Sequence, residues 1–188
     1  MKRIVISYLF HIVLLIPFVL SINLIVSKSL IISLAHSHEV KIEDWNKNLN
    51  VNLTGTFFMC NFGLPMLLES KGYIVNVSST AALGSHAWTA AYSASKGGIS
   101  AFSKTLAVEY GVKGLNVNCV CPASINTPMT KNPNLPKDID TRLLKKIMPV
   151  DGVNRSPDDI ASTIAFLASE DALHINGIDL RVDGGLLT

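Results

Sequence analysis

Apolar positions recur at helical spacing in two long stretches of the chain. Over residues 44–69 and 90–110 the apolar side chains fall three and four positions apart, which predicts two long helices that each bury one face. The second of these stretches stops before Gly111, a residue that commonly follows a helix end. Shorter helices are expected at 139–147 and 157–169, so helices should account for much of the chain.

Between these helices lie short apolar runs that are typical of buried strands. Residues 73–77 lead into a Ser-Ser-Thr turn, residues 115–121 lead into Pro122, and residues 178–182 lead into Asp-Gly-Gly. Strands that alternate with helices at this spacing predict βαβ units. The chain is therefore expected to form an α/β fold with a parallel sheet covered by helices.

The first 38 residues differ in composition from residues 39–188. Residues 4–34 consist almost entirely of Ile, Val, Leu, Phe and Ser, and Lys28 is their one charged side chain apart from histidine. The rest of the chain has the mixed composition of an ordinary soluble protein. We therefore expect two parts, namely a hydrophobic N-terminal segment at 1–38 and a folded domain at 39–188.

Three interpretations of the N-terminal segment remain open. Residues 8–26 are long enough to cross a bilayer at about 1.5 Å per residue, which indicates a membrane anchor. The basic start Met1-Lys2-Arg3, followed by an apolar stretch and Ser33-Leu34-Ala35, is also typical of a signal peptide. The third interpretation is a substitute first exon, joined to a domain whose own N-terminus has been replaced.

Charge and cysteine content narrow the compartment and the partners. The formal net charge is +2 and no Lys/Arg run exceeds two residues, so neither nucleic acid nor a polybasic lipid contact is expected. Cys60, Cys119 and Cys121 form an odd set without CxxC spacing, which favours a reducing compartment. Because further ligands at useful spacing are lacking, no metal site is expected.

Two glycosylation sequons indicate on which side of a membrane the domain would lie. Asn52-Leu53-Thr54 and Asn76-Val77-Ser78 would both accept glycans in a secretory lumen, yet both lie in elements expected to be buried. This favours a cytoplasmic domain, associated with a membrane if residues 4–34 anchor it. The basic residues at the N-terminus would themselves prefer the cytoplasm and direct the domain across, so the two indications conflict.

A phenol and an ammonium group share one face of the second long helix. Tyr92 and Lys96 are four positions apart, so their side chains are neighbours. A cation a few ångström away stabilises phenolate, and lowering the phenol pKa by about three units needs only about 4 kcal/mol. Alone, this pair is also typical of a solvated helix face.

Other polar residues occur where this chemistry would need them. Ser79 follows the strand at 73–77, at the sheet edge where open α/β sheets bind their ligands, although Ser78 competes for the same role. Asn52 lies inside the first long helix among apolar positions. Its amide either bends the helix through local hydrogen bonds or holds a water molecule.

In this order and spacing, Asn52, Ser79, Tyr92 and Lys96 resemble the catalytic tetrad of classical short-chain dehydrogenases/reductases. The resemblance continues through the Pro-Ala turn at Pro122 and ends at the glycines of residues 177–185. It implies a Rossmann-like, doubly wound parallel sheet that lacks its first βαβ units. It also implies hydride transfer between the nicotinamide of NAD or NADP and a secondary alcohol or its ketone.

The resemblance assigns a role to each matching position. Tyr92 would exchange a proton with the substrate oxygen, Ser79 would orient that oxygen, and Asn52 would hold a water molecule. Lys96 would lower the phenol pKa and bind the nicotinamide ribose together with Tyr92. The turn and loop after the third strand would contact the nicotinamide carboxamide through Pro122, Ile125 and Thr127.

The glycine-rich turn that receives the dinucleotide phosphates is missing from this sequence, because its first glycine is Gly55. Cofactor binding and the choice of NAD or NADP therefore stay open. The alternative function is a non-catalytic chain that associates with a membrane, with itself or with a full-length relative through the helices at 44–69 and 90–110. The substrate, a small alcohol or ketone, would lie beneath an apolar lid at 132–153.

Overall fold

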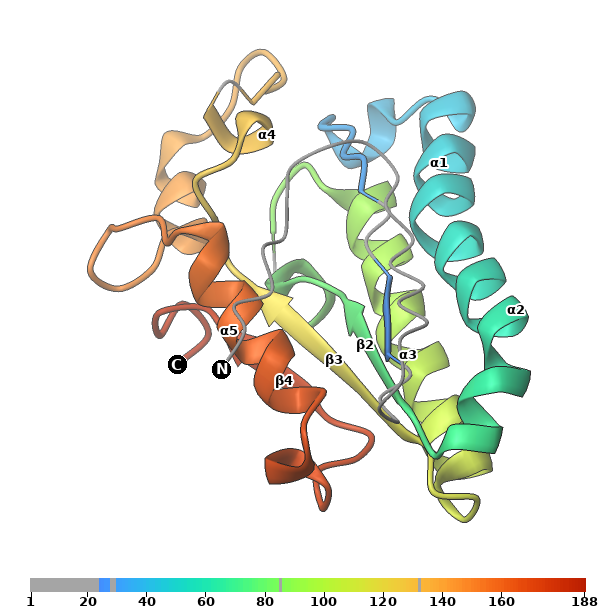
Figure 1. Ribbon diagram of the computed structural model, residues 1–188. Helices are drawn as coiled ribbons and strands as arrows, with labels where there is room; N and C mark the ends of the chain where they lie inside the picture. Colours follow the sequence, from blue (N-terminus) through green and yellow to red (C-terminus); the bar gives the residue numbers. More distant parts are fainter. Residues whose placement is uncertain (1–23, 28–29, 85, 132) are drawn as a thin grey trace.

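Helices cover both faces of a parallel sheet, which confirms the predicted architecture (Figure 1). The structure is a computed structural model that describes residues 24–27, 30–84, 86–131 and 133–188. One apolar core lies between the sheet and the helices α2 and α3, and a second lies between the sheet and α5. Both cores take their sheet residues from the same central strands, because successive side chains of a strand point to opposite faces.

The sheet has four strands in the order β1-β2-β3-β4, and each neighbouring pair is parallel. All four strands therefore end at the same edge, where the turns that follow β2 and β3 meet. The strands predicted at 73–77, 115–121 and 178–182 are confirmed within one residue at each end, whereas β1 was not predicted. Their bounds are Leu24–Ser27, Tyr73–Val77, Asn116–Pro122 and Asp179–Val182.

Strand β1 belongs to the hydrophobic N-terminal segment, yet it pairs with β2 along its whole length. Ile25 is 5% exposed and lies in the core beside Cys60 and Leu67 of α2. The helix leaves room for it at Gly63, where a Cβ atom would lie 2.1 Å from Cδ1 of Ile25. The anchor and signal-peptide interpretations fall mainly on residues 1–23, which lie outside the described residues.

Replacing Ile25 by Ala tests whether β1 is part of the fold. We expect the free energy of unfolding to fall by about 2–5 kcal/mol, because a buried branched side chain leaves a cavity between β1 and α2. Urea unfolding followed by circular dichroism measures the change. Val108→Ala, at a side chain that is 82% exposed, is the matched control. Equal stability of the two variants would show that β1 does not pack as described.

The first long helix is continuous but changes its hydrogen-bonding pattern in the middle. It consists of α1 (Ile42–Asn48), a π-helical segment η2 (Leu49–Thr54) and α2 (Gly55–Ser70). The Thr56 hydroxyl donates to the Asn52 carbonyl at 2.8 Å within this stretch. Short π segments inside helices often mark functional sites. Among the described residues this helix alone is long and apolar enough to cross a membrane, a test that core helices of soluble proteins also pass.

The second long helix, α3 (Ala90–Gly111), packs on the sheet through small and polar side chains. Asn76, in the middle of β2, is fully buried and donates to the Ser103 hydroxyl at 2.8 Å. This bond fixes the height of α3 over β2, because both groups are removed from water and each needs the other. The helix predicted at 90–110 is thereby confirmed.

The remaining helical segments are short, with one exception. Helix α5 (Pro157–Leu167) begins with a capping box between Ser156 and Asp159, so its start agrees with the sequence. The helix predicted at 139–147 forms instead as a 3-10 segment, η4 (Thr141–Ile147), none of whose residues is buried. Without a buried face, the α-helical period has nothing to stabilise it. The other segments are η1 (Ser37–Glu39), η3 (Thr80–Ala82), α4 (Pro128–Lys131) and η5 (Glu170–Ala172).

Candidate active site

Lys96 joins helix α3 to the end of β2. Its side chain is almost fully buried, with 1% exposed, and its Nζ donates to the carbonyl oxygen of Val77 at 2.8 Å. Val77 is the last residue of β2, and Ser79 follows two positions later. A buried ammonium group is costly unless it is hydrogen-bonded, so this contact fixes the lysine at the carboxyl edge of the sheet.

Tyr92 lies beside Lys96 on the same face of α3. The Nζ atom of Lys96 is 5.8 Å from the centre of the Tyr92 ring. Burial raises the pKa of the half-buried Tyr92 phenol, and a hydrogen bond with the Ser79 side chain partly offsets this rise. The pKa of Tyr92 is therefore raised, whereas the sequence predicted that Lys96 would lower it. The free-energy cost of removing the phenolate from water exceeds the stabilisation that the neighbouring groups provide. The phenol therefore carries its proton at neutral pH.

The structure separates the two serines that competed in the sequence. The Ser78 hydroxyl is 3.0 Å from both the Lys96 carbonyl and the Ser100 hydroxyl, so it attaches α3 to the sheet. Ser79 instead begins the η3 turn, where its Oγ accepts from the backbone N–H of Ala81 at 3.1 Å. Ser79 is thus the serine whose hydroxyl adjoins the phenol, and Ser78 is structural.

The Asn52 side chain forms its hydrogen bonds with the segment after β1 and with α3. Its Oδ1 accepts from the N–H of Ile31 at 2.8 Å, and its Nδ2 donates to the Ile31 carbonyl at 2.9 Å and to the Ser95 hydroxyl at 3.0 Å. The Ser95 hydroxyl in turn donates to the carbonyl of Tyr92 at 2.7 Å. Both amide hydrogens of Asn52 are used in this way, so its side chain has none left to donate to a water molecule.

Of the two interpretations of Asn52, local hydrogen bonding by its amide is wrong, because the amide bonds to Ile31 and Ser95, which lie 21 and 43 positions away in the chain. The residue is fully buried inside the π-helical segment η2. The amide reproduces the hydrogen bonds that a neighbouring strand would offer to Ile31. Asn52 is therefore a positioning residue in this chain, connected to Tyr92 through Ser95.

The loop after β3 holds the remaining candidates. The Thr80 hydroxyl donates to the Pro122 carbonyl at 3.2 Å, so this loop lies next to the turn that carries Ser79. Ile125 and Thr127 are bonded within the loop. The hydroxyl of Thr130 donates to the Ile125 carbonyl at 2.5 Å and accepts from the Thr127 N–H at 3.1 Å.

Thr130 was missed in the sequence, although a hydroxyl three residues after Thr127 is a recognisable turn signal. Its hydroxyl bonds to both Ile125 and Thr127, and the loop is also held by the Asn126 N–H, which donates to the Arg155 carbonyl at 2.8 Å. The structure thus brings Ser79, Tyr92 and Lys96 together directly, connects Asn52 and Pro122 to them through one intermediate each, and keeps Ile125 and Thr127 in a separate loop on the same edge.

Some of these residues could hold the nicotinamide half of a dinucleotide, as the resemblance implies. Lys96 and Tyr92 would hold the ribose, and the loop at 125–130 offers backbone and hydroxyl groups for the carboxamide. A binding site for the phosphates is not evident in the sequence, because the segment after β1 contains no glycine that would let a phosphate approach the backbone closely.

The three cysteines are buried free thiols. Burial raises the pKa of Cys60 to about 11, that of Cys119 to about 12 and that of Cys121 to about 11. Thiols of this kind stay protonated at neutral pH, and only the thiolate is a good nucleophile. They are therefore core residues, as the sequence indicated.

Comparison with known proteins agrees with this geometry. The family model described as enoyl-(acyl carrier protein) reductase matches residues 21–187, a range that includes β1. D-threitol dehydrogenase of Mycolicibacterium smegmatis is 40% identical over 166 residues, which cover 87% of this chain and 62% of the relative. The curated relatives are longer proteins, of whose length this chain spans between 57% and 62%.

Solved structures show the same arrangement of elements. A structure from Agrobacterium tumefaciens, described as a 2-deoxy-D-gluconate 3-dehydrogenase with bound NADP, superposes with a TM-score of 0.76 at 32% identity. The alignment covers 87% of this chain and 67% of that one. A 4-hydroxyisoleucine dehydrogenase complexed with NADH and succinate gives a TM-score of 0.76 at 28% identity, covering 89% and 69%.

Proposed function

Because the chain belongs to the short-chain dehydrogenase/reductase family, we propose that it interconverts a secondary alcohol and a ketone with NAD or NADP. The observation that carries this proposal is the cluster of Ser79, Tyr92 and Lys96 at the carboxyl edge of the sheet. A phenol that keeps its proton, next to a hydroxyl that can hold a carbonyl oxygen, is suited to reduce a ketone.

The roles follow from the positions of the side chains. Ser79 and Tyr92 hydrogen-bond to the carbonyl oxygen, and a reduced nicotinamide, held by Lys96 and Tyr92, would supply the hydride for the carbonyl carbon. Tyr92 donates its proton to the oxygen as the alcohol forms. Lys96, held by the Val77 carbonyl, stabilises the phenolate that is left until solvent returns a proton. In the reverse direction the phenolate must form first, so oxidation requires a higher pH than reduction.

Titration of the purified chain with NADH and with NADPH tests this function. We expect saturable binding in the micromolar range, followed by nicotinamide fluorescence and by heat, because Lys96 and Tyr92 would hold the ribose and the loop at 125–130 would hold the carboxamide. Nicotinamide mononucleotide is the control ligand, since it lacks the adenylate half. If a folded sample binds none of the three, the chain has no cofactor site and the oxidoreductase proposal is wrong.

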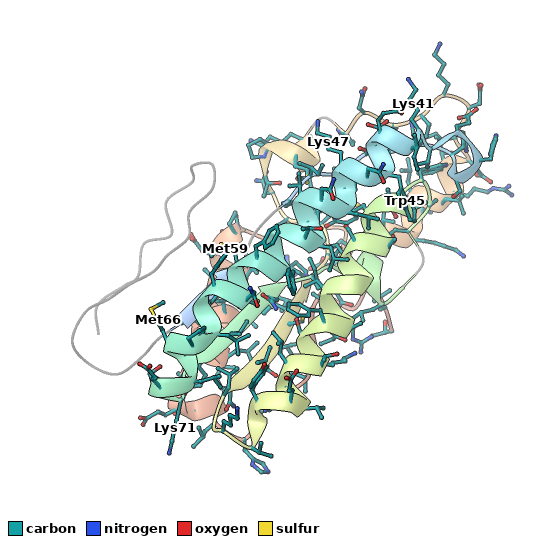
Figure 2. All side chains as sticks on the ribbon, turned by 90° about the vertical axis from the view of Figure 1, so that its right-hand side faces the viewer. Lys41, Trp45, Lys47, Met59, Met66 and Lys71 are labelled. Atoms are coloured by element: carbon teal, nitrogen blue, oxygen red, sulfur yellow. The ribbon has the colours of Figure 1, made fainter. Side chains whose placement is uncertain are left out.

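A second candidate function is association through the exposed face of α2 and α3. Phe58 and Phe62 stack with ring centres 6.1 Å apart, yet they are 49% and 74% exposed. Figure 2 shows Met59 and Met66 on the side of α2 that points away from α3, with Lys41 and Lys47 near one end of the long helix and Lys71 at the other. An apolar centre with a charged rim is typical of protein interfaces. The partner would be a second copy of the chain or a full-length relative.

Replacing Phe62 by Glu tests this association. We expect the sedimentation coefficient of the chain to fall to that of a monomer, because a carboxylate at the centre of an apolar contact has no partner. Val150→Glu, on the lid at a side chain that is 78% exposed, should leave association unchanged. If both variants sediment like the unmodified chain, this face is not the interface.

We further propose that the protein acts in the cytoplasm. Both sequon asparagines are fully buried and hydrogen-bonded inside the fold, Asn52 to Ile31 and Asn76 to Ser103. A glycan on either would prevent the observed packing. These contacts support a compartment without glycosylation.

A further inference from the structure

The residues just before β4 include a pair that is prone to spontaneous chemical change. Asn176-Gly177 is the one Asn-Gly pair in the sequence. In such a pair the backbone nitrogen of the glycine can attack the amide carbon of the asparagine, because glycine has no side chain to obstruct the approach. The rate of this attack depends on how freely both groups can move.

In the folded chain both groups are engaged in hydrogen bonds with β3. The N–H of Gly177 donates to the carbonyl of Val117 at 2.9 Å. The side chain of Asn176 accepts from the N–H of Val117 at 2.8 Å and donates to the carbonyl of Leu115 at 3.4 Å. Ring closure needs a free glycine nitrogen and an amide that can turn toward it. These bonds must therefore break before the attack can occur.

The same bonds extend the pairing of β3 with β4. The ladder between the two strands begins at Cys119 and Asp179, and Val117 lies two positions earlier on β3. Strand β4 is the last in the order of the sheet, and none of its four residues is buried. Segments with few buried contacts open at a lower free-energy cost than the core does. Separation of β4 from β3 would release Asn176 and Gly177 together.

We propose that Asn176 is a site of spontaneous deamidation that the fold protects, and that it reacts only in molecules whose β4 has separated from β3. In the reaction the Gly177 nitrogen gives its proton to solvent and bonds to Cγ of Asn176. The bond between Cγ and Nδ2 breaks, and ammonia leaves. Water then opens the succinimide at either carbonyl carbon, which yields aspartate or isoaspartate without any oxidation or reduction.

Isoaspartate at position 176 prevents β4 from returning to its place. It carries the main chain through Cβ and so adds one backbone atom between position 176 and Gly177. The Gly177 nitrogen is then displaced from the Val117 carbonyl, and the pairing of β4 that follows is displaced with it. Chemical modification of an open form makes the loss of the native state irreversible.

Incubation of the purified full chain at mildly alkaline pH, in buffer and in urea concentrated enough to unfold it, tests the protection. Chromatography and mass spectrometry of proteolytic peptides measure aspartate and isoaspartate at position 176. We expect the reaction in urea to be faster by at least about tenfold, because only open molecules react in buffer. A smaller ratio, or no reaction in urea, would overturn the proposal.

Lys104→Ala tests whether the opening is the separation of β4. The ammonium group of Lys104, on α3, pairs with the Asp179 carboxylate, whose side chain is 8% exposed. Without the lysine this carboxylate lacks its charged partner, so β4 should open more often and the rate in buffer should rise at least about threefold. The rate in urea should not change. Lys145→Ala, on an exposed side chain of η4, is the control and should alter neither rate. An unchanged rate in buffer for Lys104→Ala would contradict the role of β4.

Hydrogen exchange of the β4 amides tests the consequence of the modification. The chain that carries isoaspartate, returned from urea to buffer, should exchange these amides without protection. Asn176→Asp is the matched control, because its carboxylate can still accept from the Val117 N–H and its main chain is unaltered. We expect this variant to protect β4. Equal protection in both chains would show that isoaspartate does not displace the strand.

Discussion

Tyr92→Phe is expected to lower kcat/KM for ketone reduction by about 10²–10⁴-fold, because it removes the proton that Tyr92 would donate to the substrate oxygen. The fold should be unaffected. The ring stays in place against Lys96, and Ser79, which loses its bond to the phenol, still accepts from the Ala81 N–H. Steady-state kinetics with NADH, together with thermal unfolding of the same sample, would measure both effects.

The matched control for this variant is Tyr110→Phe, which makes the same chemical change near the C-terminal end of α3, whereas Tyr92 lies near its N-terminal end. It should leave both kinetics and stability unchanged. If Tyr92→Phe keeps more than about a tenth of the activity, the proton comes from elsewhere and the assignment of Tyr92 is wrong.

Asn52→Leu is expected to lower the free energy of unfolding by about 2–4 kcal/mol. The leucine has a similar volume but leaves the N–H and the carbonyl of Ile31 without the partners they have now. Because Ser95 also loses a partner, the Tyr92 backbone is less firmly held, and activity should fall with stability.

Chemical denaturation of Asn52→Leu, compared with Asn50→Leu, isolates the buried amide. Asn50 lies two positions earlier on the same helix and is exposed, so its replacement should change stability by less than about 0.5 kcal/mol. Equal effects of the two substitutions would mean that the bonds to Ile31 do not hold the segment after β1.

The sequence predicted those elements whose burial has a clear period. Strands β2 and β3 are almost entirely buried and the helices α2, α3 and α5 each bury one face, and all of these were predicted. Strand β4 has no buried residue, and the Asp-Gly-Gly turn that follows it marked its end. Strand β1 was not predicted because its short apolar run lies within a longer, mostly apolar stretch, where a strand of four residues cannot be distinguished from part of a membrane span. The helix expected at 139–147 became a 3-10 segment because none of its residues is buried.

The candidate site was predictable as a set of residues but not as a set of contacts. Spacing alone paired Tyr92 with Lys96 and placed Ser79 at the strand end. It could not choose Ser79 over Ser78, because both follow the same strand and only the packing of α3 distinguishes them.

The bond between Lys96 and the Val77 carbonyl changes how the motif should be interpreted across relatives. Because Lys96 also joins α3 to β2, it contributes to the stability of the fold as well as to the proposed chemistry. We therefore expect relatives that have lost their activity to keep this lysine. The same expectation applies to Asn52, whose side chain forms two hydrogen bonds with the backbone of Ile31. Lys96 and Asn52 are therefore poor markers of activity, because inactive relatives are expected to keep them. The hydroxyl of Tyr92 has fewer structural contacts, so we expect it to be lost first when activity is lost.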